Sequence, residues 1–172
     1  MSDELLVVRC QLGEREAFAE LVRGWHPVIE RYVGRMLGGS GDDVVQEIWL
    51  AVFRGLPGLR QPDRFTPWLF AIARRAVMNR LRDAYARPDS ELIDDVPADD
   101  GTEGVLDREA LTGALEALPA REREVLLLFY LEDLSLSACA QICAVPVGTV
   151  KSRLYRARKL LRDELIRKGY EA

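Results

Sequence analysis

The sequence predicts an all-α protein made of two small helical domains that are joined by a flexible acidic linker. Apolar residues recur every three or four positions along most of the 172-residue chain, and no useful stretch alternates polar and apolar residues as a strand would. Residues 83–107 hold nine acidic residues and one basic residue, so they carry −8 in a chain whose net charge is −4, and the rest carries +4. This stretch has few large apolar side chains, which is typical of a linker. We therefore expect domains over 1–83 and 105–172, with the linker over 84–104.

The first predicted domain is helical throughout. Pro27 lies within its first apolar stripe and is expected to kink or divide that helix. The glycine-rich break that follows leads to Asp42 and Asp43, either of which suits the cap of the next helix. The predicted elements are a helix over 14–37, a helix from Asp42 or Asp43 to about Phe53, a loop over 54–66, and a helix marked by Trp68 to Leu81.

The second predicted domain contains four helices. Pro119 suits the start of its second helix, and Ser135 or Ser137 suits the cap of its third. The sequence AVPVGT then forms a tight connection to the last helix. The predicted helices cover about 106–117, 120–131, 135–143 and 147–168.

The last two predicted helices match a helix-turn-helix motif. Their inner faces are expected to be Leu136, Cys139, Ala140 and Cys143 on the first helix and Val147, Val150, Leu154, Ala157 and Leu161 on the second. Residues 146–162 hold six basic residues and no acidic residue, whereas a merely solvated face usually mixes signs. The start of the second helix meets base edges in such motifs. Here those residues are Thr149, Lys151, Ser152, Arg153 and Arg156, with Tyr155 nearby, while Arg158, Lys159 and Arg162 suit phosphate contacts.

Composition argues against catalysis and metal binding. Three cysteines and one histidine suit neither a disulfide framework nor a zinc site, and neither a nucleophile–base pair nor a phosphate-cradling glycine loop occurs. We therefore expect no catalytic residue, no metal, no cofactor and no small-molecule substrate. Cys139 and Cys143 are expected in the core, and a redox role for them stays open. The absence of a long apolar run or a signal peptide predicts a cytoplasmic protein.

Two sets of motifs resemble a known family. The sequence LPAREREVLLLFYLEDLSLSACAQICAVPVGTVKSRLYRARKLLRDEL resembles region 4 of bacterial sigma factors of the extracytoplasmic-function (ECF) group, and PVGTVKSRLYRAR is its most specific part. The sequences DDVVQEIWLAVFRGL and RFTPWLFAIARRAVMNRLRD resemble region 2 of the same family. Together the resemblance covers almost the whole chain, with both regions in the family's order.

The resemblance implies an alternative sigma factor that is not an enzyme. Such a factor binds core RNA polymerase, through the clamp helices of the largest subunit and the flap of the second-largest, directs it to promoter DNA, and is commonly held by an anti-sigma factor. The residues that match the polymerase-binding positions are Asp42, Asp43, Gln46, Glu47 and Trp49. The minus-10 element would be met by the loop over 54–66 and by Arg60, Arg64, Arg74, Arg75, Asn79 and Arg82. The minus-35 element would be met by Thr149, Lys151, Ser152, Arg153, Tyr155, Arg156, Arg158 and Lys159.

The chain departs from the family pattern at a few positions. Arg75 and Asn79 stand where the family commonly has Asn and Asp, which makes that helix more basic. Ala144 replaces a frequent glycine in the turn of the helix-turn-helix, and a positive φ there would cost roughly 1 kcal/mol relative to glycine. Phe65 and Trp68 are candidates for stacking on bases, although aromatic residues at helical spacing are more often core.

Two other functions fit parts of the sequence. One is a helix-turn-helix transcriptional regulator whose N-terminal helices form a sensing or dimerisation domain, which would bind paired half-sites without polymerase. The other is an interaction protein that sequesters a partner, although this function leaves the basic helix unexplained.

Overall fold

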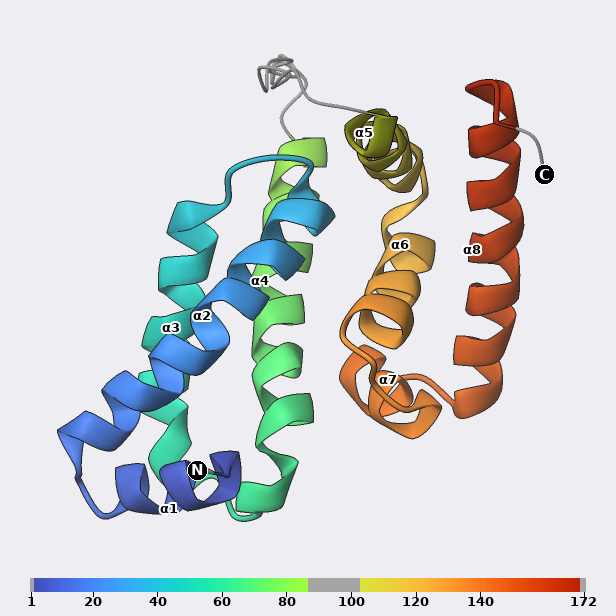
Figure 1. The fold of residues 1–172 in the computed structure, drawn as a ribbon. Helices are drawn as coiled ribbons and strands as arrows, with labels where there is room; N and C mark the ends of the chain where they lie inside the picture. Colours follow the sequence, from blue (N-terminus) through green and yellow to red (C-terminus); the bar gives the residue numbers. More distant parts are fainter. Residues whose placement is uncertain (1, 87–102, 171–172) are drawn as a thin grey trace. The chain divides into compact units, whose positions relative to one another are not determined.

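The computed structural model describes residues 2–86 and 103–170, and within these ranges the chain is helical with no β-strand (Figure 1). The predicted all-α class is therefore confirmed. The helices form two compact units, the first built from α1 to α4 and the second from α5 to α8. Most of the predicted acidic linker, residues 87–102, lies outside the described ranges, although α4 extends to Ala86 and α5 begins at Glu103.

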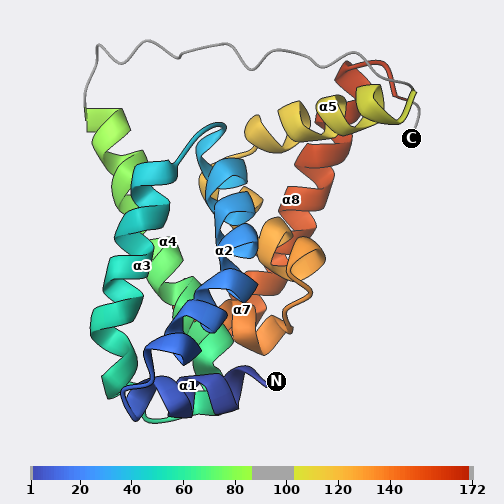
Figure 2. The ribbon, with the colours of Figure 1, turned by 60° about the vertical axis from the view of Figure 1, so that its left-hand side comes forward.

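The first unit is a small bundle in which α1 lies across one end of the three longer helices (Figures 1 and 2). Large apolar side chains from α2, α3 and α4, among them Tyr32, Ile48 and Phe70, are fully buried between these helices. The elements are α1 (Asp3–Gln11), α2 (Arg15–Leu37), α3 (Asp42–Gly55), the 3₁₀ turns η1 (Leu56–Gly58) and η2 (Pro62–Arg64), and α4 (Phe65–Ala86).

Helix α2 runs without interruption through Pro27. The expectation that this proline could divide the helix is therefore wrong. Proline removes one backbone hydrogen bond from a helix. The buried residues Leu21, Ile29 and Val33 lie on both sides of it and pack the helix against the core. The helix ends at Gly38, whose φ of 69° is a left-handed conformation that suits glycine.

The expected side-chain cap of α3 is wrong. Gly41 occupies the N-cap position, and Asp42 and Asp43 are the first two helical residues instead. A side chain at Gly41 would collide with Val33 of α2, so the close packing of α2 on the start of α3 requires glycine there. Both aspartates still lie in the first turn, where the helix dipole favours negative charge.

Helix α1 has no counterpart among the predicted elements. Only Leu6 and Val7 on this short helix are buried, whereas Leu5 and Val8 are exposed, so its apolar residues do not form one clear stripe. The region expected as a loop over 54–66 is also partly helical, because α3 extends to Gly55 and two 3₁₀ turns follow before α4 begins at Phe65.

The second unit packs α6 and α8 closely together and completes its core with α5 and α7. The segment predicted as one helix over 120–131 is α6 followed by a π-helical turn, in which Glu132 donates to the carbonyl of Leu127 at 3.0 Å. Ser135 caps α7, as one of the two predicted caps, by accepting a hydrogen bond from the N–H of Ala138 at 3.1 Å. The elements are α5 (Glu103–Glu116), α6 (Ala120–Leu126), η3 (Leu127–Leu131), α7 (Leu136–Cys143) and α8 (Val147–Arg167).

The turn between α7 and α8 contains a strained residue. Ala144 has a φ of 52°, and the N–H of Val145 donates to the carbonyl of Ala140 at 3.1 Å, which is the pattern of a helix end that usually carries glycine. Ala144 therefore has the positive φ that was expected to make alanine less favourable than glycine at this position. The expectation that Val147 faces inward is wrong, because this residue begins α8 at the edge of the turn and is exposed.

Candidate nucleic-acid and protein interfaces

The helix-turn-helix consists of α7, the turn over 144–146 and α8. Val150, Leu154 and Ala157 face the core of the unit, so the helix turns its basic residues outward. Thr149 and Arg153 are half-buried. The remaining members of the predicted minus-35 set are exposed, namely Lys151, Ser152, Tyr155, Arg156, Arg158 and Lys159.

Two arginines of this face contact side chains of α6 and η3. Nε of Arg156 lies 3.6 Å from Oε1 of Glu122 on α6, and Nη1 of Arg158 donates to the hydroxyl of Tyr130 at 3.0 Å. Residues 146–162 contain no acidic residue, so the partner Glu122 was not predicted. It is brought to Arg156 by the packing of α6 on α8. Arg156 is nevertheless 68% exposed, which leaves the rest of its guanidinium accessible.

Arg153 differs from these neighbours. Its Nη1 is shielded from solvent and has no hydrogen-bond acceptor among the described residues. A shielded donor without an acceptor is costly, so a base edge that supplied an acceptor would relieve that cost.

The first unit carries a second polar, basic surface on α4. Arg75, Asn79 and Arg82 are spaced four and three residues apart and are all exposed, so they share one face of the helix. Nη2 of Arg82 donates to Oδ1 of Asn79 at 2.9 Å. Arg60 and Arg64 are exposed in the preceding loop. Arg74, the last member of the predicted minus-10 set, is half-buried and lies off this row.

A groove of about 340 Å³ runs between α3 and α4 beside this basic row. Its wall includes the indole of Trp68, which is half-buried and packs against the backbone of Gly55. Phe65 is only 1% exposed and therefore belongs to the core, so it is not placed to stack on a base. The groove is lined by Glu47, Ile48, Ala51, Gly55, Trp68, Ala71, Ile72, Arg75, Ala76 and Asn79.

The acidic residues of α3 form a third surface. Asp42, Asp43, Gln46 and Glu47 are exposed, whereas Trp49 is half-buried and stacks on His26 of α2 with ring centroids 6.3 Å apart. Asp43 is paired with Arg80 of α4. Of the five residues predicted to bind polymerase, Trp49 is thus the one turned toward α2.

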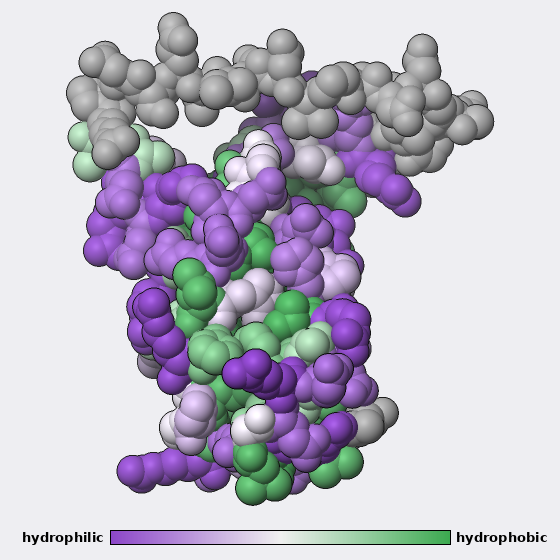
Figure 3. Space-filling view, turned by 90° about the vertical axis from the view of Figure 1, so that its left-hand side faces the viewer, coloured by the Kyte–Doolittle hydropathy of each residue, from purple (hydrophilic) through white to green (hydrophobic). Residues whose placement is uncertain are grey.

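Sequence reasoning missed two apolar residues on this surface. Leu50 is 51% exposed and Phe53 is 62% exposed, although both are large hydrophobic side chains. They follow Gln46 by four and seven residues, so a helical projection centred on the polar face of α3 would have found them. Figure 3, viewed from the side where α3 is drawn in Figure 1, shows apolar side chains gathered among hydrophilic ones. Exposed apolar residues with an acidic border are typical of a protein-binding surface.

The two cysteines of α7 are buried, in agreement with the prediction that they fill the core. Burial raises the pKa of the Cys139 thiol to about 11, so this group stays protonated at neutral pH. A protonated, buried thiol is a poor nucleophile. None of the described helices is long and apolar enough to span a bilayer.

Two family models match the chain in the order of its two units. The one described as Sigma-70 region 2 matches residues 21–87, and the one described as Sigma-70, region 4 matches residues 108–161. The chain is also 31% identical to the ECF RNA polymerase sigma-E factor of Escherichia coli (strain K12), in an alignment that covers 96% of this chain and 95% of that protein. The chain belongs to the ECF sigma factors of the sigma-70 family.

Further relatives agree with this family. The ECF RNA polymerase sigma factor SigW of Bacillus subtilis (strain 168) is 30% identical over 89% of this chain and 91% of its own length. In a solved structure, the sigma factor RpoE of Bartonella quintana, in complex with the anti-sigma factor NepR, has a TM-score of 0.73 and 25% identity, with 89% of this chain and 98% of that chain covered.

This ECF sigma factor is therefore a non-enzymatic transcription initiation factor that binds core RNA polymerase and directs it to promoters. The alternative of a regulator with an N-terminal sensing or dimerisation domain is wrong, because sigma region 2 occupies that part of the chain.

Proposed function

We propose that this sigma factor reads the minus-35 element with the outer face of α8. The observation that carries this assignment is the helix-turn-helix itself, whose second helix buries Val150, Leu154 and Ala157 and exposes basic residues without an acidic one up to Arg162. Arg153, near the start of α8, reads base edges, and Lys159, farther along, meets phosphates. Glu122 engages Nε of Arg156, so the Nη atoms remain for a base or phosphate.

The minus-10 element is assigned to the loop over 54–66 and to α4. The loop exposes Arg60 and Arg64, and α4 continues with the basic row of Arg75, Asn79 and Arg82. A positively charged track beside an aromatic residue suits a single strand, because the charge follows the phosphates while the ring offers a stacking surface. Trp68 is the half-buried aromatic residue in the groove next to this row.

Core polymerase docks on α3 through its clamp helices, and the second unit meets the flap. Four exposed polar or acidic residues at the start of α3 favour a basic partner. The exposed side chains of Leu50 and Phe53 add the apolar area that a stable protein contact needs. We assign both residues to the docking surface together with Asp42, Asp43, Gln46, Glu47 and Trp49.

An anti-sigma factor completes the proposed set of partners. The structure of RpoE from Bartonella quintana was solved in complex with the anti-sigma factor NepR, and it aligns with most of this chain. The same apolar and acidic surface of α3 that meets polymerase is the part of the first unit best suited to such a partner. We place the protein in the cytoplasm, beside the polymerase it serves.

The test is run-off transcription with purified core polymerase, this protein and a randomised promoter library, followed by sequencing of the transcribed templates. The proposal expects paired enrichment of a minus-35 and a minus-10 motif only when both proteins are present. Enrichment of a minus-10 motif alone would remove the assignment of α8. Specific binding of duplex by the protein alone, with no transcription by active core, would contradict the proposal as a whole.

A further inference from the structure

The side chain of Gln11 connects α1 to the loop between α3 and α4. Its Nε2 donates to the carbonyl oxygen of Leu56 at 3.1 Å and to that of Leu59 at 2.7 Å. Both acceptors belong to the first turn of the loop, more than 40 positions away in sequence. The contact is partly buried, so it competes less with water than a surface hydrogen bond does.

Both hydrogen bonds are accepted by backbone carbonyl oxygens, so they restrain the course of the main chain. The carbonyl of Leu56 also accepts from the N–H of Leu59 at 3.1 Å, which closes the 3₁₀ turn η1. Gln11 therefore holds both ends of this turn with one amide group. The carbonyl of Leu59 immediately precedes Arg60, so its orientation sets the direction in which the next residues leave the turn.

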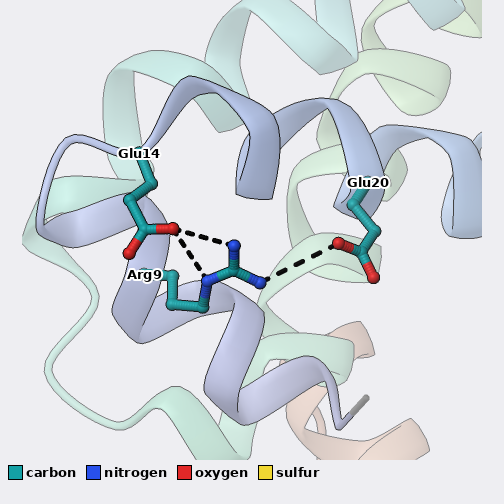
Figure 4. Close-up of polar contacts among 3 residues, drawn as sticks. All are labelled: Arg9, Glu14 and Glu20. Carbon is teal, nitrogen blue, oxygen red and sulfur yellow. Dashed lines mark hydrogen bonds and ion pairs between the residues drawn. The ribbon is translucent and has the colours of Figure 1, made fainter.

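Helix α1 gives Gln11 a fixed starting point. Nε and Nη2 of Arg9 each lie 2.8 Å from one carboxylate oxygen of Glu14, and Nη1 lies 3.9 Å from Glu20 (Figure 4). This guanidinium joins the end of α1 to α2. Leu6 and Val7 are buried beneath the helix, and α1 contacts both short turns of the loop (Figures 1 and 2).

We propose that Gln11 is a positioning residue for minus-10 recognition. It fixes the backbone over residues 56–59 and thereby the direction in which Arg60, Gln61 and Arg64 project toward the DNA. Gln11 makes no contact with the promoter itself. This inference rests on the proposed function, which assigns minus-10 specificity to the loop.

The test uses two substitutions of similar side-chain length, Gln11→Met and Gln11→Glu. Methionine removes the hydrogen bonds, and ionised glutamate cannot donate and brings a negative charge to two carbonyl oxygens. Run-off transcription with core polymerase is measured on promoters that carry each single-base change in the minus-10 and minus-35 elements. The matched control is Glu4→Met, because Glu4 is exposed on the same helix and makes no hydrogen bond or ion pair among the described residues.

The expected result is a loss of about tenfold in discrimination between minus-10 bases, as for the removal of one to two hydrogen bonds. Discrimination at the minus-35 element and binding to core polymerase should match wild type. Glu4→Met should behave as wild type throughout. An equal loss of discrimination at both elements would overturn the proposal, because it would show a general loss of folding or assembly.

Hydrogen exchange on the full chain supplies a second readout that does not depend on transcription. Both Gln11 variants should accelerate exchange of the amides around Leu59, while the amides in the middle of α2 keep wild-type protection. Unchanged exchange around Leu59 would overturn the positioning role even if transcription falls.

The variants Arg60→Ala and Arg64→Ala distinguish the positioning role of Gln11 from the proposed recognition of the minus-10 element by the loop. If they change minus-10 discrimination and the Gln11 variants do not, the role of Gln11 is overturned and the assignment of the loop stands. If neither pair changes it, the assignment of the loop is itself wrong.

Discussion

Asp43 at the start of α3 accepts a hydrogen bond from Nη2 of Arg80, which lies on α4, at 2.5 Å. The pair joins the helix proposed to dock on polymerase to the helix proposed to meet the minus-10 strand. The hydrogen bond from Arg80 lowers the pKa of the Asp43 carboxyl below its ordinary value of 3.8. The side chain of Asp43 is 62% exposed and that of Arg80 is 47% exposed. Because both are this exposed, the pair adds little stability, and another cation can compete for Asp43.

Arg80→Met should return the pKa of Asp43 toward its ordinary value. A carboxyl whose pKa is lowered in the folded state contributes stability above the unfolded pKa and loses it as the pH falls through the folded value. Any difference in stability between wild type and the variant should therefore fade in acid. Titration of the Asp43 carboxyl by NMR in both proteins measures the shift. Identical titration of Asp43 in both proteins would show that the pair does not form in solution.

Gly55→Ala should destabilise the first unit by about 1 kcal/mol. An added Cβ would lie 3.0 Å from Cζ2 of Trp68, so the indole or the helix must move, and overpacking of this kind outweighs the helix propensity of alanine. Gly24→Ala is the matched control, because Gly24 lies within α2 with open space around its Cα and should gain about 1 kcal/mol. Urea unfolding followed by tryptophan fluorescence distinguishes the two. A stabilised Gly55→Ala protein would mean that Trp68 moves away freely.

Ala144→Gly should stabilise the second unit by about 1 kcal/mol, because glycine adopts the positive φ of this turn without steric cost. Ala138→Gly, in the first turn of α7, should instead destabilise the unit by up to about 1 kcal/mol, because glycine has a lower helix propensity than alanine. Calorimetric unfolding of both variants measures the opposite signs. Destabilisation by both would indicate that the turn does not hold Ala144 in the left-handed region.

The thiol of Cys139 should make stability fall at alkaline pH. Its folded pKa of about 11 lies above the ordinary value of 9.0, so the unfolded chain loses its proton first as the pH rises. The stabilisation is complete below the unfolded pKa and is lost between about pH 9 and 11, by roughly 2 to 3 kcal/mol. Cys139→Val should lack this part of the pH dependence.

Diamide treatment at pH 7, followed by mass spectrometry, should find no disulfide between Cys139 and Cys143. Detection of such a disulfide would support a redox role for these two cysteines.

Arg153→Ala and Lys159→Ala should separate base reading from phosphate contact. Neither residue is ion-paired within the described part of the chain, so their loss does not disturb the contacts that Glu122 and Tyr130 make with other arginines. Arg153→Ala should weaken minus-35-dependent initiation by about 1–3 kcal/mol and relax the preference for one base. Lys159→Ala should weaken binding evenly and reduce the salt slope by about one. A uniform effect of Arg153→Ala across all promoters would make it a phosphate contact.

The helical class, the two units and the family could be predicted from the sequence alone. These properties depend on local patterns: the spacing of apolar residues that built α2 and α8, the serine that caps α7, and the contiguous motifs around residues 42–55 and 146–158. Local periodicity and short motifs are visible in one dimension because residues three or four positions apart already share a helical face. Where the apolar pattern was weak, as in α1, the helix itself was missed.

Which side chains meet across elements depends on the tertiary structure. The bonds from Gln11 to the loop, the pair of Arg80 with Asp43 and the approach of Glu122 to Arg156 all join residues far apart in the chain. No pattern within a short window contains both partners of such a contact. Their meeting depends on how helices pack, and packing is set by the shapes of many buried side chains at once.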